Sequence, residues 1–260
     1  MEGPAEESTS AGALPRVVAI VAGAVVALVL VLSFVVLIGG YRWFPGVVDC
    51  KLKAGDRTVE LTSEDAERAA SVSASAVRRG VSAKTATAAV AEALDISEED
   101  ARVVASALTG RTAHALTCVH GGSGDEERDR LNRAGLTARA AAVRRDLEQA
   151  FGPQRVGGFA PGGVTSGHMP GSAHYEGRAV DVFFRPATKR NRAKGWATAQ
   201  YLVAHADRLS VNTVIFDGQI WTHRRAIQGW REYSVDTSRR SAQVIAILEH
   251  RDHVHVDVAD

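Results

Sequence analysis

The chain has 260 residues, of which 45% are hydrophobic and 23% are charged, and its formal net charge is +1. This length and apolar content are sufficient for one or two packed domains. The near-neutral charge argues against a nucleic-acid-binding protein, which would need a marked excess of Lys and Arg.

The first forty residues predict a tail followed by a membrane anchor. Residues 1–15 are rich in Glu, Ser, Gly and Pro, a composition typical of disorder. Residues 17–38 carry no charged side chain, and their number is close to the roughly 20 residues that span a bilayer as a helix. We therefore expect a transmembrane helix within residues 16–40. A buried helix and a cleaved signal peptide are the alternatives.

Two cysteines flank a helical stretch after the expected anchor. The chain contains only Cys50 and Cys118, which favours a disulfide formed outside the cytoplasm over two buried free thiols. Anchor and cysteines together predict a single-pass membrane protein with most of its chain extracytoplasmic. Residues 61–116 are rich in alanine and predict about three short helices. We expect residues 41–120 to form a small helical domain that serves as a spacer or a wall-binding module.

The rest of the chain predicts an α+β domain over residues 135–260, after a polar, glycine-rich linker at residues 121–134. The expected elements are a helix at residues 137–152, a glycine-rich loop at 152–172, a buried strand at 177–184, an amphipathic helix at 190–209, a hairpin at 213–223 and a last strand at 252–258. Residues 242–250 fit either a helix or a strand. This pattern predicts a mainly antiparallel sheet.

Histidines and an aspartate on two of these strands predict a metal site. Side chains on a strand repeat every two residues on one face, so His253 and His255 point the same way. His174 precedes the strand that carries Asp181, and the small residues between them allow the histidine to fold back. Two imidazoles and one carboxylate with an open fourth position are typical of a catalytic zinc site. Zinc is favoured over iron or copper because the donors are nitrogen and oxygen, without a cysteine.

The same residues carry a resemblance to a known family. The stretches SAHYEGRAVD at residues 172–181 and DHVHV at residues 252–256 resemble the paired motifs of the D-Ala-D-Ala carboxypeptidase and dipeptidase family of zinc peptidases. That family shares its fold with L-Ala-D-Glu endopeptidases and with the amino-terminal domain of hedgehog proteins. The spacing of VIFDGQIWT, GWREY and DHVHV is similar to that in a wall-facing actinobacterial branch of the same family. The resemblance covers about residues 135–260 and implies a hedgehog-type α+β fold.

The resemblance also implies a role for each motif residue. The implied zinc ligands are His174, Asp181 and His255. Asp252, three residues before the last ligand, is implied as the general base, and Glu249 is its competitor for that role. His253 would face the cleft and stabilise the oxyanion, and Ser172 would form a hydrogen bond near the first ligand.

One departure from the family makes catalysis less secure than metal binding. Active members usually carry an aromatic residue followed by an arginine upstream of the first ligand, whereas this chain has Phe159 followed by Ala160. Such an arginine holds substrate or polarises the scissile carbonyl. Arg155 and Arg178 are the candidates for replacing it as substrate-binding residues.

Two further features have ordinary interpretations beside functional ones. We expect His168, in the glycine-rich loop, to be a surface residue. We expect Asp257, beyond the last ligand, to be a frayed terminal residue. A run of cations after the metal-bearing strand is typical of a solvated face, or of a patch that attracts wall peptides or anionic polymers. The run comprises Arg185, Lys189, Arg190, Arg192 and Lys194.

These observations predict a membrane-anchored, zinc-dependent metallopeptidase that hydrolyses an amide bond in peptidoglycan stem peptides, as a D,D-carboxypeptidase or as an endopeptidase. The alternative is a catalytically weak or inactive zinc-containing module that binds the cell wall. A third hypothesis is an envelope protein whose residues 61–118 bind a protein partner.

Overall fold

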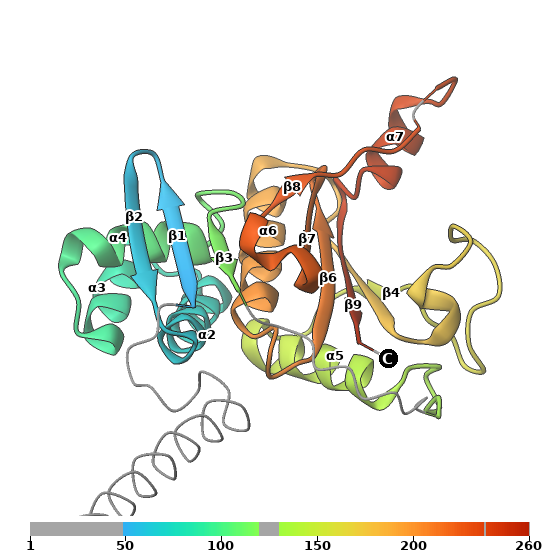
Figure 1. The fold of residues 1–260 in the computed structure, drawn as a ribbon, viewed down its shortest axis with the longest axis horizontal. Coiled ribbons are helices and arrows are strands. Elements are labelled where there is room, and N and C mark those ends of the chain that lie inside the picture. The colour runs from blue at the N-terminus through green and yellow to red at the C-terminus, as the bar shows by residue number, and fades with distance from the viewer. Residues whose placement is uncertain (1–48, 120–129, 237, 260) are drawn as a thin grey trace, which may run out of the picture. The chain divides into compact units, whose positions relative to one another are not determined.

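The computed structural model of the chain describes residues 49–119, 130–236 and 238–259 (Figure 1). These residues belong to one compact unit, Val48–Asp260. The predicted tail at residues 1–15 and most of the predicted linker at residues 121–134 lie outside the described residues.

The predicted transmembrane helix is corrected by the structure. Among the described residues, no helix is long and apolar enough to cross a membrane. The longest of them, α2 (Ser63–Arg79), has 17 residues and carries charged side chains, whereas a span needs about 20 apolar residues. Residues 16–40, where the anchor was predicted, lie outside the described part of the chain. The transmembrane element of the predicted fold and the single-pass localisation are corrected accordingly, because nothing in the described residues supports them.

The first part of the described chain combines a small sheet with three helices (Figure 1, blue to green). Its elements are β1 (Cys50–Ala54), β2 (Arg57–Leu61), α2, α3 (Ala83–Leu94), α4 (Glu98–Leu108) and β3 (Leu116–Cys118). The strands are antiparallel, in the order β2-β1-β3. The three helices agree with the sequence pattern. The strands were missed because the buried residues of β1, Cys50 and Leu52, alternate with exposed lysines over only five positions.

Serine and threonine caps fix the starts of these helices. The hydroxyl of Thr62 accepts a hydrogen bond from the amide of Asp65, and that of Ser97 accepts one from the amide of Asp100, each at 3.1 Å. Gly80 ends α2 in the left-handed region, which glycine adopts without steric cost. The starts of α2 and α4 and the end of α2 therefore rest on capping interactions.

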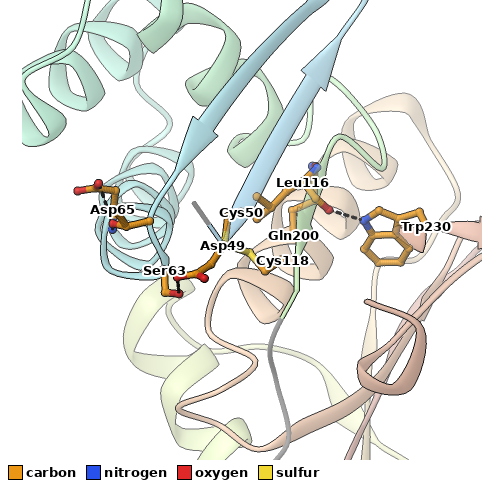
Figure 2. Close-up of a disulfide and its surroundings, with 9 residues drawn as sticks. Asp49, Cys50, Ser63, Asp65, Leu116, Cys118, Gln200 and Trp230 are labelled. Atoms are coloured by element: carbon orange, nitrogen blue, oxygen red, sulfur yellow. Dashed lines mark hydrogen bonds between the residues drawn. A yellow bond between two sulfur atoms is a disulfide. The ribbon is translucent and has the colours of Figure 1, made fainter. Parts of the chain in front are cut away.

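The predicted disulfide between Cys50 and Cys118 is present (Figure 2). The two residues face each other across β1 and β3, and neither side chain is exposed. Closing a loop over a separation of 68 residues is worth about 4 kcal/mol in the chain-entropy treatment. The disulfide therefore holds the β1–β2 hairpin to β3.

Gln200 and Trp230 attach β3 to the rest of the unit (Figure 2). The side-chain oxygen of Gln200 accepts hydrogen bonds from the amides of Ala115 and Leu116 at 2.9 and 3.0 Å. The indole of Trp230 donates to the carbonyl of Leu116 at 2.9 Å. Because Gln200 is fully buried, these bonds are shielded from water, and the small sheet is fixed to α6.

The second part of the described chain is built on a six-stranded antiparallel sheet in the order β4-β5-β9-β6-β7-β8. The strands are β4 (Val156–Gly157), β5 (Ala179–Phe183), β6 (Val211–Phe216), β7 (Gln219–Thr222), β8 (Arg231–Glu232) and β9 (His253–Val258). The helices are α5 (Ala138–Phe151), α6 (Lys189–Ala204) and α7 (Ala242–Leu248), with short 3-10 turns at Ala173–Glu176 and His223–Gln228. The predicted antiparallel α+β domain is confirmed, and β9 lies in the middle of its sheet.

Helix α6 is the shared core element of the two parts. It contacts α2, α4 and β3 as well as β6 and β9, and residues 195–204 are buried without interruption. Gly195 permits the approach to β6, because a Cβ there would lie 2.1 Å from the ring of Phe216. The sheet that carries the predicted metal ligands thus rests on the buried part of α6, residues 195–204.

Candidate metal centre

Three elements bring the predicted metal ligands together. Asp181 on β5 and His255 on β9 are directly paired across the two strands. His174 lies in the 3-10 turn before β5, and Gly177 ends that turn in the left-handed region. A Cβ at Gly177 would lie 2.6 Å from the carbonyl oxygen of Gly135, so only glycine allows the chain to turn back here.

The donor atoms of these three side chains form a small triangle. Nε2 of His174 lies 3.0 Å from Nδ1 of His255, and Oδ1 of Asp181 lies 3.2 Å from each of these nitrogens. All three residues are buried, with exposed fractions of 2%, 6% and 8% for His174, Asp181 and His255. A tetrahedral zinc ion with bonds of about 2.0 Å places its ligands about 3.3 Å apart. The triangle therefore fits a metal ion with little rearrangement.

The backbone around Gly158 fixes the orientation of the first ligand. Nδ1 of His174 donates to the carbonyl oxygen of Gly158 at 2.7 Å, which leaves the Nε2 lone pair directed at Asp181 and His255. Gly158 has a φ of +79°, and a Cβ there would lie 2.3 Å from the His174 ring. The hydroxyl of Ser172 accepts a hydrogen bond from the His174 amide at 3.4 Å. Ser172 therefore caps the turn that carries the first ligand.

Without a metal ion, a proton on His255 balances the negative charge of the buried Asp181. Burial alone would lower the pKa of His255, but hydrogen bonds and charge from Asp181 and Asp257 raise it to about 9. Burial would raise the pKa of Asp181, yet its contacts with His174 and His255 hold it well below the usual range. A metal ion at the triangle must displace the proton on Nδ1 of His255. Asp257, 3.5 Å from Nε2 of that ring, would then orient the ligand.

Two further histidines border the triangle. Ligand atoms of His168, His174 and Asp181 all lie within 4.8 Å of one another, so these residues form a group that could hold a metal ion. The ring of His168 stacks on that of His174, with centroids 3.9 Å apart, although the sequence predicted a surface residue. The ring of His250 lies 4.5 Å from that of His253, and burial lowers its pKa to about 3. No sequence pattern indicated His250, because it lies before β9 and outside the alternation of that strand.

The predicted general base and oxyanion residue form a pair. Nδ1 of His253 donates to Oδ1 of Asp252 at 2.7 Å, and Nε2 of His253 lies 3.9 Å from Oδ1 of Asp181. Burial would raise the pKa of Asp252, but hydrogen bonds from His253 and Arg185 lower it. Glu249, the competing base, accepts a hydrogen bond from Arg251 at 2.5 Å. His253 therefore lies between Asp252 and the metal ligands.

The two arginines predicted to bind substrate lie in other contacts. Arg178 donates to the carboxylate of Glu176 and to the carbonyl of Val258. Arg155 is exposed, and its carbonyl pairs with the amide of Phe183. The arginine that reaches the candidate base is Arg185, from the cation run after β5. In the sequence, this contact of Arg185 with Asp252 is indicated only by the position of Arg185 shortly after the strand that carries Asp181.

One comparison with known proteins bears on this part of the chain. Residues 132–244 match the model of a family described as VldE, C-terminal domain. The matched range includes His168, His174 and Asp181 but ends before Asp252, and it is less than half of the chain. Neither the curated proteins nor the solved structures gave a match.

Proposed function

We propose that this domain is a zinc metallopeptidase that hydrolyses an amide bond in peptidoglycan stem peptides. The observation that carries the proposal is the triangle of His174, Asp181 and His255, with sides of 3.0 to 3.2 Å. Its corners come from two sequence motifs that resemble those of D-Ala-D-Ala carboxypeptidases and dipeptidases. The disulfide agrees with a substrate outside the reducing cytosol, where disulfides persist.

The donor set favours zinc. Two imidazole nitrogens and one carboxylate oxygen are the donors of catalytic zinc sites, which keep one position open for water or substrate. A bound zinc ion supplies Lewis-acid activation of water and of a scissile carbonyl near neutral pH. His174 would bind through Nε2, His255 through Nδ1 and Asp181 through Oδ1.

Asp252 and His253 are suited to move the proton of such a reaction. Asp252 fixes Nδ1 of His253 as a hydrogen-bond donor, so Nε2 faces the ligand atoms. The pair can take a proton from the attacking water and return it to the leaving amine. Both side chains are mostly buried, which limits their contact with bulk water.

A wall-binding module without turnover is the second candidate. The absent arginine after Phe159 favours it, and Phe159 instead packs against Arg144, whose guanidinium carbon lies 5.5 Å from the ring centroid. A module of this kind would keep the zinc ion and bind stem peptides without cleaving them.

Metal analysis followed by peptide assays tests the proposal. We expect about one zinc ion per full-length chain, and its loss in His174→Ala and His255→Ala. His114→Ala, which changes an exposed histidine beside Trp196, is the control and should keep the metal. The metal-loaded wild type should cleave stem-peptide fragments, and Asp252→Asn should keep the metal and stop cleavage. Peptide binding without cleavage would favour the wall-binding module, and a folded chain that takes up no zinc would overturn both candidates.

A further inference from the structure

The register of the large sheet places one arginine in line with the metal ligands. Five residues pair one after the other across β5, β9, β6, β7 and β8, namely Asp181, His255, Ile215, Ile220 and Arg231. Directly opposite residues of antiparallel strands carry their side chains on the same face of a sheet. Arg231 therefore lies on the face of the metal triangle, on the edge strand of the sheet.

The opposite face of the same strands packs on α6. Val214 and Trp221 pair with each other at the next positions of β6 and β7, and neither is exposed. The ring of Phe216, on the same face as Val214, approaches Gly195 of α6. The row that contains Arg231 therefore faces away from this core.

Arg231 lacks an anionic partner in the described part of the chain. Its only side-chain hydrogen bond there runs from Nη2 to the hydroxyl of Thr222, at 2.9 Å. Its Nε is buried and has no hydrogen-bond partner among the described residues. Burial lowers the pKa of Arg231, and the nearby charge of Arg225 lowers it further. The charge that acts on this guanidinium is thus another cation.

Other arginines of the fold are paired with carboxylates. Four of them have a carboxylate oxygen at 2.5 to 2.7 Å, namely Arg185, Arg192, Arg208 and Arg251. A partly buried guanidinium with an unmet donor costs free energy that a bound anion recovers. Arg231 differs from these four, and its position favours an anion that arrives with a ligand.

We propose that Arg231 binds an acidic side group of the peptide substrate, about four residues away from the scissile bond. The inference rests on the proposed function, because it takes the scissile carbonyl to lie at the metal triangle. A guanidinium suits this role, since its planar donors match the two oxygens of a carboxylate. The substrate class that follows is an acidic peptide whose anion lies within the chain.

The spacing of the strands sets this separation. Neighbouring strands lie about 4.8 Å apart, so the steps from β9 through β6 and β7 to β8 cover about 14 Å. An extended peptide advances about 3.4 Å per residue and needs about four residues for this distance. Ile215 and Ile220 occupy the interval, so no charged side chain of the row competes for the anion. A dipeptide is too short to reach the metal triangle and Arg231 together.

Two arginines near the proposed subsite provide a graded comparison. Arg224 and Arg225 are exposed, consecutive residues of the 3-10 turn at His223–Gln228. Arg225 lowers the pKa of Arg231, and Arg224 is not among the charges that act on it. Arg224→Gln therefore removes one positive charge from the same turn and is the matched control. Arg225→Gln removes a charge that adds to the potential at Arg231.

The test uses peptides that contain one D-Ala-D-Ala pair and a single Glu among uncharged residues. The Glu stands at successive distances from the scissile bond, on its amino-terminal side in one series and on its carboxyl-terminal side in the other, and Gln replaces it in the reference peptides. Calorimetric binding and cleavage are measured with the zinc-loaded full-length chain. We expect Glu to be preferred over Gln about 10-fold when it lies about four residues from the bond, the effect of one hydrogen bond between charged groups.

The variants identify the residue that reads the charge. Arg231→Gln should keep the zinc ion and lose the preference for Glu, and Arg231→Lys, which keeps the positive charge, should retain part of it. Arg225→Gln should weaken the preference less than Arg231→Gln does, and Arg224→Gln should leave it unchanged. Zinc content and thermal unfolding of each variant confirm that it is folded.

The outcomes separate this inference from the proposed function. A position-dependent preference that is lost in Arg231→Gln supports the inference even if no peptide is cleaved, in which case only the proposed turnover fails. Equal binding of all peptides by the wild type overturns the inference, whatever the variants do, and cleavage of those peptides would leave the peptidase standing. A preference that survives in Arg231→Gln also overturns it, because another residue would then bind the anion.

Discussion

Two polar clusters in this molecule, each with a buried histidine, look alike in composition and differ in how their atoms meet. The helical cluster lies between α2, α5 and α6 and contains Ser71, Asp146, Tyr201, His205 and Arg208. The metal cluster lies on the large sheet and contains His174, Asp181 and His255. Each holds a buried histidine near an aspartate, so residue types alone do not distinguish them.

The difference is in the match of donors to acceptors. Each oxygen of Asp146 meets a donor, from Tyr201 at 2.7 Å and from Arg208 at 2.7 and 3.1 Å. In the metal cluster, three atoms that carry lone pairs face one another at 3.0 to 3.2 Å. Asp146 is therefore fully paired without a ligand, whereas the metal cluster calls for a cation or a shared proton. Convergence of lone pairs therefore identifies a metal site better than burial of a histidine does.

The largest expected difference between the clusters concerns the metal itself. Asp181→Ala should reduce bound zinc from about one ion per chain to almost none, because it removes one of three donors and the only negative one. Asp146→Ala, the corresponding change in the helical cluster, should lower thermal stability and leave the zinc content unchanged. Metal analysis of both purified variants checks this. Equal zinc loss in the two would break the comparison.

A smaller effect is expected from Gly158→Ala. The added methyl would press on the His174 ring and disturb its hydrogen bond to the Gly158 carbonyl, so zinc affinity should fall about 10- to 100-fold. Gly162→Ala is the matched control, because its φ of +82° is similar but no atom lies within 4 Å of its Cβ position. Competition with a zinc chelator measures both affinities. A similar fall in the control would assign the effect to backbone strain.

The pH dependence of zinc binding sharpens the comparison further. The pKa of His255 in the metal-free protein is about 9, above its ordinary value, so this ring is protonated at neutral pH. Zinc must release that proton, and apparent affinity should therefore rise about tenfold per pH unit up to pH 9. The pKa of His205, lowered to about 4 by burial, should leave no trace in this range. Chelator competition between pH 6 and 9 gives the slope, and a flat profile would contradict the shared proton.

The smallest effect is expected in the helical cluster. Tyr201→Phe removes the hydroxyl that donates to Asp146, and the cost should be about 1 kcal/mol of unfolding free energy. Zinc affinity should not change, because this hydroxyl is bonded within the helical cluster. Denaturant unfolding and chelator competition on the same preparation check both statements. A change in zinc affinity would show that the two clusters are coupled.

Local patterns predicted much of this fold. Caps at Thr62 and Ser97 begin two of the expected helices, and the Asp217-Gly218 pair forms the turn of the expected hairpin of β6 and β7, where both residues have positive φ. Each of these signals lies within a few residues of the element it defines. The strands that carry the cysteines were missed because their alternation is too short to stand out from an alanine-rich helical segment.

The site was predictable only in part, for a related reason. Spacing within two motifs indicated His174, Asp181, Asp252 and His255, because each motif lies on one turn or strand. His168 and Arg185 reach the cluster through a loop path and a side-chain direction that no periodicity encodes. The predicted membrane anchor rested on composition alone, and the described helices gave it no support.

The position of β9 has a consequence for biosynthesis. This strand lies between β5 and β6, yet it is translated after every other strand of the sheet. Until it inserts, β4 and β5 form one fragment and β6 to β8 another, each with an open edge. His255 arrives with β9, so the nascent chain cannot assemble its metal triangle before the sheet closes. Ribosome-bound chains that stop short of residue 253 should therefore be prone to aggregation and unable to form the complete zinc site.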